Sequence, residues 1–235
     1  MNKFNLKMKH ERKVSYFKKD NFIHKNGELL IEKTIDYFSK EIKSSLSFDE
    51  LKIKKSKKIK KVLNQNIDKF YSISGKFGGI FSNFSLQLAM DENPNDAISK
   101  LFSLLNTNGV LCMNLLTKNS MSNLTKIFFE IDEKIYNGYY QRFGPFVEVS
   151  DIIELLNKNK FKDIVTNIER LEINYSSLEN LRNDFKEFGT SNYYNIKIPF
   201  KKEFLVYTTK VFDSLINKYK YIPVEIEIAT FTAWK

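Results

Sequence analysis

The chain alternates between two kinds of hydrophobic spacing. Apolar residues three or four positions apart predict amphipathic helices. Unbroken apolar runs and strict alternation of apolar and polar residues predict strands. The helical pattern covers residues 27–42, 54–70, 95–105, 124–135, 150–157, 178–188 and 201–218. The extended pattern covers residues 48–53, 79–83, 109–117, 163–175 and 224–232. Helices that alternate with strands predict an α/β fold with a mainly parallel sheet.

Two strand segments and two helix starts refine this prediction. Residues 109–117 are continuously apolar, which is typical of a parallel strand covered on both faces. Residues 224–232 alternate strictly, so they are predicted to be a half-exposed, antiparallel strand at the C-terminal end. Ser150 is a predicted N-cap, and Ser176 with Glu179 forms a predicted capping box.

The composition narrows the protein class. The chain has 235 residues, 42% of them hydrophobic, which is enough for one α/β domain with a substantial core. The content of 8 Gly, 4 Pro and 1 Cys excludes collagen-like chains and disulfide-stabilised scaffolds. No apolar run approaches the roughly 20 residues of a membrane-spanning helix. One cysteine and the absence of a secretory h-region predict a cytoplasmic protein.

The positive charge is the feature most open to interpretation. Lys and Arg outnumber Asp and Glu by 38 to 28, a net charge of +10, and seven lysines fall within Lys52–Lys61. The residue types encoded by AT-rich codons are abundant throughout, so we interpret this run as a solvated face. A phosphate-contacting patch for nucleic acid, an anionic lipid surface or an acidic carrier is the alternative. Nucleic-acid binding is the most distant of these, because the run lacks the interleaved aromatic residues on which bases stack.

The residues typical of metal and thiol chemistry are scarce. Cys112 lies in an apolar run, so it is predicted to be a small buried hydrophobic residue. His10 and His24 have no neighbouring Cys or His at ligand spacing. No metal site and no nucleophilic cysteine are predicted.

Several segments in collinear order resemble a known family. They are FNLKMKHER with FIHKNGELLIEKTIDYF, IFSNFSLQLAMDENP, AISKLFSLLNTNGVLCMNLL, VSDIIELLNKNKF, NYSSLENLRNDFKEFGTSN and VEIEIATFTAW. Together they resemble the class I S-adenosylmethionine-dependent methyltransferases, in the branch that holds the malonyl-acyl-carrier-protein methyltransferase and a complex I assembly factor. The resemblance implies a Rossmann-like sheet with an antiparallel C-terminal strand.

The resemblance also implies a layout and a site. One domain over 1–235 would comprise an N-terminal helical segment (1–45), a reduced cofactor-side core (46–118) and a substrate side (119–235). S-adenosylmethionine would be the cofactor, and a small acid, an acyl carrier or a protein side chain the methyl acceptor. Ser82 and Asn83, at the end of a strand, are the candidate cofactor-binding residues. Arg142 and Tyr175 are the candidate substrate-binding residues, and an internal ion pair is the alternative role for Arg142.

One departure from the family bears on function. The family binds its cofactor at a glycine-rich turn after the first strand, whereas this chain has no glycine between Gly27 and Gly75. The first- and second-strand region is therefore predicted to be shortened. Two functions stay open: a catalytically active methyltransferase, and an inactive relative that serves as a binding or assembly factor. No catalytic residue is identified.

Substitutes for the missing elements are few. Gly75, Gly78 and Gly79 are predicted to form the ordinary turn that enters the strand at 79–83. The family uses an acidic residue to bind the ribose hydroxyls of its cofactor. In this chain the acids that could take that role are Asp49, Glu50 and Asp68.

Overall fold

The computed structural model describes residues 21–48, 57–91, 93–188 and 198–235. Its strands are β1 (Ser45–Phe48), β2 (Val62–Gln65), β3 (Phe77–Asn83), β4 (Leu105–Leu116), β5 (Lys162–Tyr175) and β6 (Ile222–Trp234). Its α-helices are α2 (Phe22–Asp36), α3 (Leu86–Met90), α4 (Pro94–Leu104), α5 (Ser122–Tyr136), α6 (Val149–Lys158), α7 (Leu178–Phe188) and α8 (Lys202–Tyr219). A 3₁₀ helix, η1, covers Ile67–Ser72.

The strands form one six-stranded sheet in the order β2-β1-β3-β4-β6-β5. Strands β2, β1, β3 and β4 are parallel, and β6 lies antiparallel between β4 and β5. This order, with an antiparallel C-terminal strand inserted beside the edge, is that of the class I methyltransferase fold. The predicted fold class is therefore confirmed, and β2, which follows β1 after only a short stretch of chain, is four residues long.

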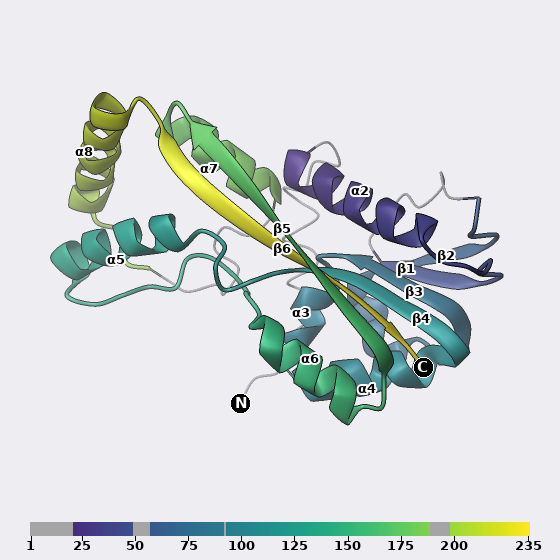
Figure 1. Cartoon of the computed structure of the whole chain (residues 1–235). Coiled ribbons are helices and arrows are strands. Elements are labelled where there is room, and N and C mark those ends of the chain that lie inside the picture. The colour runs from purple at the N-terminus through teal and green to yellow at the C-terminus, as the bar shows by residue number, and fades with distance from the viewer. Residues whose placement is uncertain (1–20, 49–56, 92, 189–197) are drawn as a thin grey trace.

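Helices cover the two faces of the sheet unequally (Figure 1). Helices α3, α4 and α6 lie on one side, where their apolar residues join β3 and β4 in the largest core cluster. Helix α2 lies on the other side and packs Ile31 and Ile35 against Phe81 and Cys112. The first part of β6, residues 222–227, pairs with β5 alone. This two-stranded ribbon extends toward α7 and α8. The uneven cover leaves part of the α2 side of the sheet open.

The first two strands differ from the prediction. Strand β1 covers Ser45–Phe48 and thus begins three residues before the strand predicted at 48–53, whose remaining residues lie outside the described part. Residues 54–70 are predicted to be helical, yet Val62–Gln65 is a strand and only η1 is helical. The reason is nonlocal: Val62–Gln65 pairs in parallel with β1, and this pairing overrides the helical spacing.

Helix boundaries also shift. Helix α2 begins at Phe22 behind the N-cap Asn21 and ends at Asp36, so Phe38 and Ile42 are buried after the helix instead of within it. Helix α6 is preceded by Glu148, so Ser150 lies inside the helix and is no N-cap. In α7 the Ser177 hydroxyl accepts a hydrogen bond from the Asn180 amide at 3.1 Å, so Ser177 takes the capping role predicted for Ser176.

Strand β6 is more buried than its alternating sequence predicts. Residues 226–233 are all buried, and from Ile228 onward the strand is paired on both sides, with β4 and with β5. The polar members of the alternation therefore need internal partners, as described below for Glu227. Within the described ranges, no helix is long and apolar enough to cross a membrane.

Candidate active site at the carboxyl ends of the strands

The sheet has one point at which the chain changes direction. From β1 the chain continues to β2 on one side, and from β3 it continues to β4 on the other. The carboxyl ends of β1 and β3, at Phe48 and Asn83, are adjacent at this reversal. Ligands of open α/β sheets bind outside the carboxyl ends of the strands at such a point. This edge is the candidate active site.

A buried amide network closes one side of this edge. The Asn83 side-chain amide donates to the His24 carbonyl at 2.9 Å, and the Asn114 amide donates to the Gly27 carbonyl at 2.7 Å and to Asn83 Oδ1 at 3.0 Å. The Thr230 hydroxyl donates to Asn114 Oδ1 at 2.7 Å. The network thus attaches the first turns of α2 to the ends of β3 and β4. Asn114 was not singled out from the sequence, although a polar residue in an otherwise apolar run is the signal for it.

Ser82 and Asn83 therefore have internal partners. The Ser82 hydroxyl is fully buried and accepts a hydrogen bond from the Leu86 amide at 3.0 Å, at the start of α3. Phe84, the next residue after this pair, has a left-handed backbone with φ of 66°, which turns the chain away from the sheet. Contact between the Ser82–Asn83 pair and a cofactor stays a prediction.

Arg142 is held by an internal carboxylate. Its guanidinium forms an ion pair with Asp132, which is completely buried in α5. The guanidinium also lies 5.3 Å from the Phe128 ring centre and 4.6 Å from that of Phe204. The second carboxylate oxygen of Asp132 accepts from the Tyr140 amide at 3.2 Å. The planar guanidinium that made Arg142 a candidate thus forms a structural pair with Asp132. Contact between Arg142 and a substrate stays a prediction.

Tyr175 is the last residue of β5 and is buried. Its ring centre lies 6.3 Å from that of Phe185. Burial, and secondarily the nearby Asp184 carboxylate, raises the pKa of the Tyr175 hydroxyl. The raised pKa favours the neutral phenol at physiological pH. A role in substrate contact stays a prediction.

An aromatic cluster connects these residues. The His24 ring lies 5.5 Å from Phe84 and 5.0 Å from Phe188. Phe185, one turn before Phe188 in α7, contacts Tyr175 and also Phe143, which leads to Phe128 beside Arg142. The members of this cluster are His24, Phe84, Phe128, Phe143, Tyr175, Phe185 and Phe188. Tyr175 belongs to this cluster, Arg142 lies beside its Phe128, and Asn83 donates to the backbone of its His24, whereas Ser82 bonds the start of α3. The sequence did not reveal the cluster because its members come from three helices, one strand and two connecting segments.

Asp68 is the acid that the structure places at the carboxyl edge. It lies in η1, three residues after β2 ends. Its Oδ1 atom is buried and has no hydrogen-bond partner among the described residues. Asp49 and Glu50 lie outside those residues. A buried carboxylate oxygen without a donor is a ready acceptor for a ligand hydroxyl.

The glycines before β3 lie at the opposite edge. Gly78 and Gly79 are in the first half of β3, close to the Ser44 carbonyl and Ile42, and Gly75 precedes the strand with φ of 110°. They enter the strand as predicted and do not replace a cofactor turn. In the ranges that the structure covers, no group of metal-ligating side chains is present. Cys112 is buried, and burial raises the pKa of its thiol to about 12, so it stays protonated and unreactive.

Glu227 forms a second polar network, beside the carboxyl end of β4. Its carboxylate accepts hydrogen bonds from the Thr117 hydroxyl at 2.6 Å, from Arg170 Nε at 2.7 Å and from the Asn119 amide at 2.8 Å. Burial raises the pKa of Glu227, but these donors outweigh it and hold the pKa below its ordinary value of 4.5. The network attaches the segment after β4 to β5 and β6.

Replacing Glu227 by glutamine is expected to destabilise the fold in a pH-dependent manner. A lowered pKa in the folded state means that the carboxylate stabilises the protein above the unfolded-state pKa, and that this contribution is lost as the pH falls through the folded-state pKa. We expect a loss of about 1–3 kcal/mol near neutral pH. The difference from the wild type should shrink as the pH falls from about 6 to about 3. Thermal unfolding across this range measures it, with Glu154→Gln on the exposed face of α6 as the control. A difference that did not change with pH would contradict the assignment.

Comparisons with known proteins give partial matches. No family model matches the chain. The arginine-hydroxylase NDUFAF5 of Dictyostelium discoideum is 27% identical over 113 residues, which are 48% of this chain and 26% of that protein. Malonyl-[acyl-carrier protein] O-methyltransferase 1 of Coxiella burnetii is 26% identical over 113 residues, 48% of this chain and 36% of that protein. The matches thus span about a quarter and a third of the lengths of these curated relatives.

Solved structures align over more of the chain at lower identity. A methyltransferase from Archaeoglobus fulgidus aligns with 90% of this chain and 94% of its own, at 14% identity and a TM-score of 0.43. The mycolic acid cyclopropane synthase CmaA1 aligns with 88% of this chain and 83% of its own, at 12% identity and a TM-score of 0.48. The strand order itself carries the fold assignment. The strand order is thus that of the class I S-adenosylmethionine-dependent methyltransferase fold, and the chain is similar over about half of its length to two curated proteins, one of which is named a methyltransferase.

Proposed function

We propose that the chain binds S-adenosylmethionine at the carboxyl ends of β1, β2 and β3 and transfers its methyl group to an acceptor. The observation that carries this proposal is the orphan carboxylate oxygen of Asp68 just after β2. A class I fold uses an acidic side chain after its second strand to bind the ribose hydroxyls of the cofactor. Asp68 is the acid at that position, and its free acceptor suits a hydroxyl donor.

The other residues of the edge would position the reactants. The amide network around Asn83 and Asn114 holds the start of α2 rigidly against the strand ends. The aromatic cluster would exclude water from one wall of the site. The bound cofactor supplies a methyl group on a sulfonium, which is already activated. The contribution of the protein is therefore mainly to hold the two reactants in line.

The acceptor class follows from charge and from the relatives. One relative is named as a methyltransferase of a malonylated acyl-carrier protein. A net charge of +10 would attract an acidic carrier, an acidic protein or a small acid through long-range electrostatics. We propose an acceptor from these three groups and expect the reaction to take place in the cytoplasm.

Calorimetric titration of the full chain with S-adenosylmethionine tests this function. We expect saturable binding that Asp68→Asn weakens about tenfold, since one charge-assisted hydrogen bond is worth about 1.5–3 kcal/mol. Asp213→Asn, an exposed site on α8, should leave the affinity unchanged. No binding at millimolar concentrations would overturn the proposal. Binding without methyl transfer to any acidic acceptor would instead support a role as a non-catalytic binding or assembly factor.

A further inference from the structure

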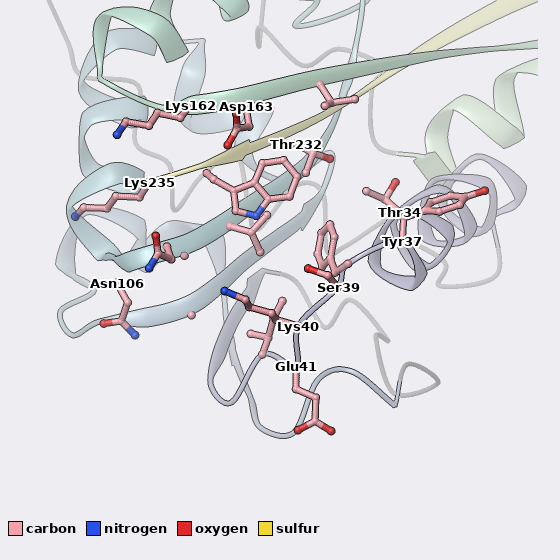
Figure 2. Close-up of a pocket in the computed structure, with 18 of the residues that line it drawn as sticks. Thr34, Tyr37, Ser39, Lys40, Glu41, Asn106, Lys162, Asp163, Thr232 and Lys235 are labelled. Atoms are coloured by element: carbon pink, nitrogen blue, oxygen red, sulfur yellow. The ribbon is translucent and has the colours of Figure 1, made fainter.

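A large groove lies at the edge of the sheet opposite the candidate active site. Its volume is about 1180 Å³, and its walls come from the end of α2, the segment that follows it, the starts of β3, β4 and β5, and the end of β6. Figure 2 shows its polar lining, with Lys40 on the wall after α2 and Asn106 and Lys162 on other walls. Ligands of the class I fold bind at the carboxyl ends, so this groove is separate from the proposed cofactor position.

The groove exists because the sheet is uncovered there. Helix α2 ends at Asp36, and residues 37–44 cross the sheet edge without a helix. The crossing segment is nonetheless fixed. The Ile42 amide donates to the Lys58 carbonyl at 2.7 Å, the Lys60 amide donates to the Ile42 carbonyl at 3.0 Å, and the Lys58 ammonium donates to the Asp36 carbonyl at 2.6 Å. The groove is therefore preformed.

An aromatic corner lies within the groove. Phe38 and Trp234 both line it, with ring centres 5.9 Å apart and planes at 72°. At this separation the two rings are in edge-to-face contact, and because Phe38 is only 9% exposed, Trp234 is the more accessible ring. A flat ring in the groove can stack on the accessible part of the Trp234 indole, an arrangement that aromatic groups prefer. Val165, 57% exposed in β5, adds apolar surface to the opposite wall.

Unpaired cations surround this corner. Across the described ranges, the side-chain ammonium groups of four lining lysines form no hydrogen bond or ion pair, namely those of Lys33, Lys40, Lys43 and Lys162. Of the three lining acids, Glu41 is neutralised by Lys60 at 2.7 Å, which leaves Asp163 and Glu169. The Lys235 ammonium donates to backbone carbonyls outside the groove. The unpaired charge around the groove is therefore net positive and calls for an anion.

We propose that this groove binds a phosphorylated aromatic heterocycle of nucleotide size. The heterocycle would stack on Trp234 where it lines the groove beside Phe38, and the phosphates would contact Lys40 and Lys43 at the crossing segment. The volume accommodates a nucleoside triphosphate together with ordered water. This site goes beyond the proposed methyl transfer, since neither the cofactor nor the acceptor is required to reach it.

Fluorescence of Trp234 gives a direct measurement, because this residue is the only tryptophan in the chain. Titration of the full chain with ATP, AMP, adenosine and inorganic phosphate is expected to give saturable quenching with ATP and AMP. Adenosine should bind at least about fivefold more weakly because it lacks the charge that the lysines recognise, and raised salt should weaken ATP binding. Inorganic phosphate alone should not quench.

Three variants locate the site. Lys40→Gln combined with Lys43→Gln should weaken ATP binding about tenfold, and Val165→Glu should abolish it by placing a carboxylate in the opposite wall. Both changes are at exposed positions, so folding should be preserved. Lys158→Gln, an exposed lysine of α6, is the matched control and should bind as the wild type does.

Three results would overturn the proposal. One is the absence of quenching by any nucleotide at millimolar concentrations. Another is quenching that the two groove variants leave unchanged. The third is quenching by an acidic peptide such as tetraglutamate but not by nucleotides, which would assign the groove to a protein partner. The calorimetric titration with S-adenosylmethionine is independent of Trp234, so failure of either proposal can be recognised separately.

Discussion

Replacement of Asp132 by alanine is expected to cost about 3–5 kcal/mol of folding free energy, because it leaves the guanidinium of Arg142 buried without a counter-charge. Asp132 is completely buried, and its carboxylate also accepts the Tyr140 amide at 3.2 Å. For a chain of this length the loss corresponds to a fall in melting temperature of roughly 10 °C. Thermal and denaturant unfolding measure it.

Two further variants make this result specific to the ion pair. Glu130→Ala, at an exposed position of the same helix, should change stability by less than about 0.5 kcal/mol. The double variant Asp132→Ala with Arg142→Met should be more stable than Asp132→Ala alone, because it removes the unpaired charge. Equal losses in the single and double variants would contradict a structural pair. The role of Arg142 in substrate contact would then become the stronger explanation for its burial.

Replacement of Gly27 by alanine is expected to destabilise the protein by about 2–4 kcal/mol, although alanine is the better helix former. A Cβ atom at this position would lie 2.1 Å from Asn83 Oδ1 and 2.8 Å from a ring carbon of Phe84. The helix would have to move away from the strand ends, and the hydrogen bonds that Asn83 and Asn114 donate to the helix would be lost. Buried groups left without partners account for most of the cost.

Gly138→Ala is the matched control, because no atom lies within 4 Å of a Cβ built there. We expect it to be neutral in the same unfolding experiment. A gain of about 1 kcal/mol for Gly27→Ala, as helix propensity alone predicts, would show that the close approach of α2 to β3 is not required.

The hydrophobic pattern predicted the segments whose partners are close in sequence. The ends of α4, α5 and α8 lie within two residues of their predicted bounds, and so does the carboxyl end of the buried strand β4. The agreement is good because local spacing decides which face of an element is buried. The residues of strand β2 have helical spacing and were predicted to be helical. The prediction was wrong because the pairing of β2 with β1 is nonlocal. The burial of β6 between β4 and β5 likewise depends on the order of strands in the sheet, which periodicity does not encode.

For the site, the sequence alone selected the Ser82–Asn83 pair, Arg142 and Tyr175 and showed that the glycine turn of the family is missing. Residue type and position relative to a strand end sufficed for that. Only the tertiary structure decided which of their polar atoms already have partners, since those partners lie far away in the chain: Asn83 with His24 and Arg142 with Asp132. The same long-range packing left the Asp68 oxygen without a donor and opened the groove beside Trp234. The unpaired oxygen and the groove both depend on which atoms the rest of the chain leaves without a neighbour, and only folding determines that.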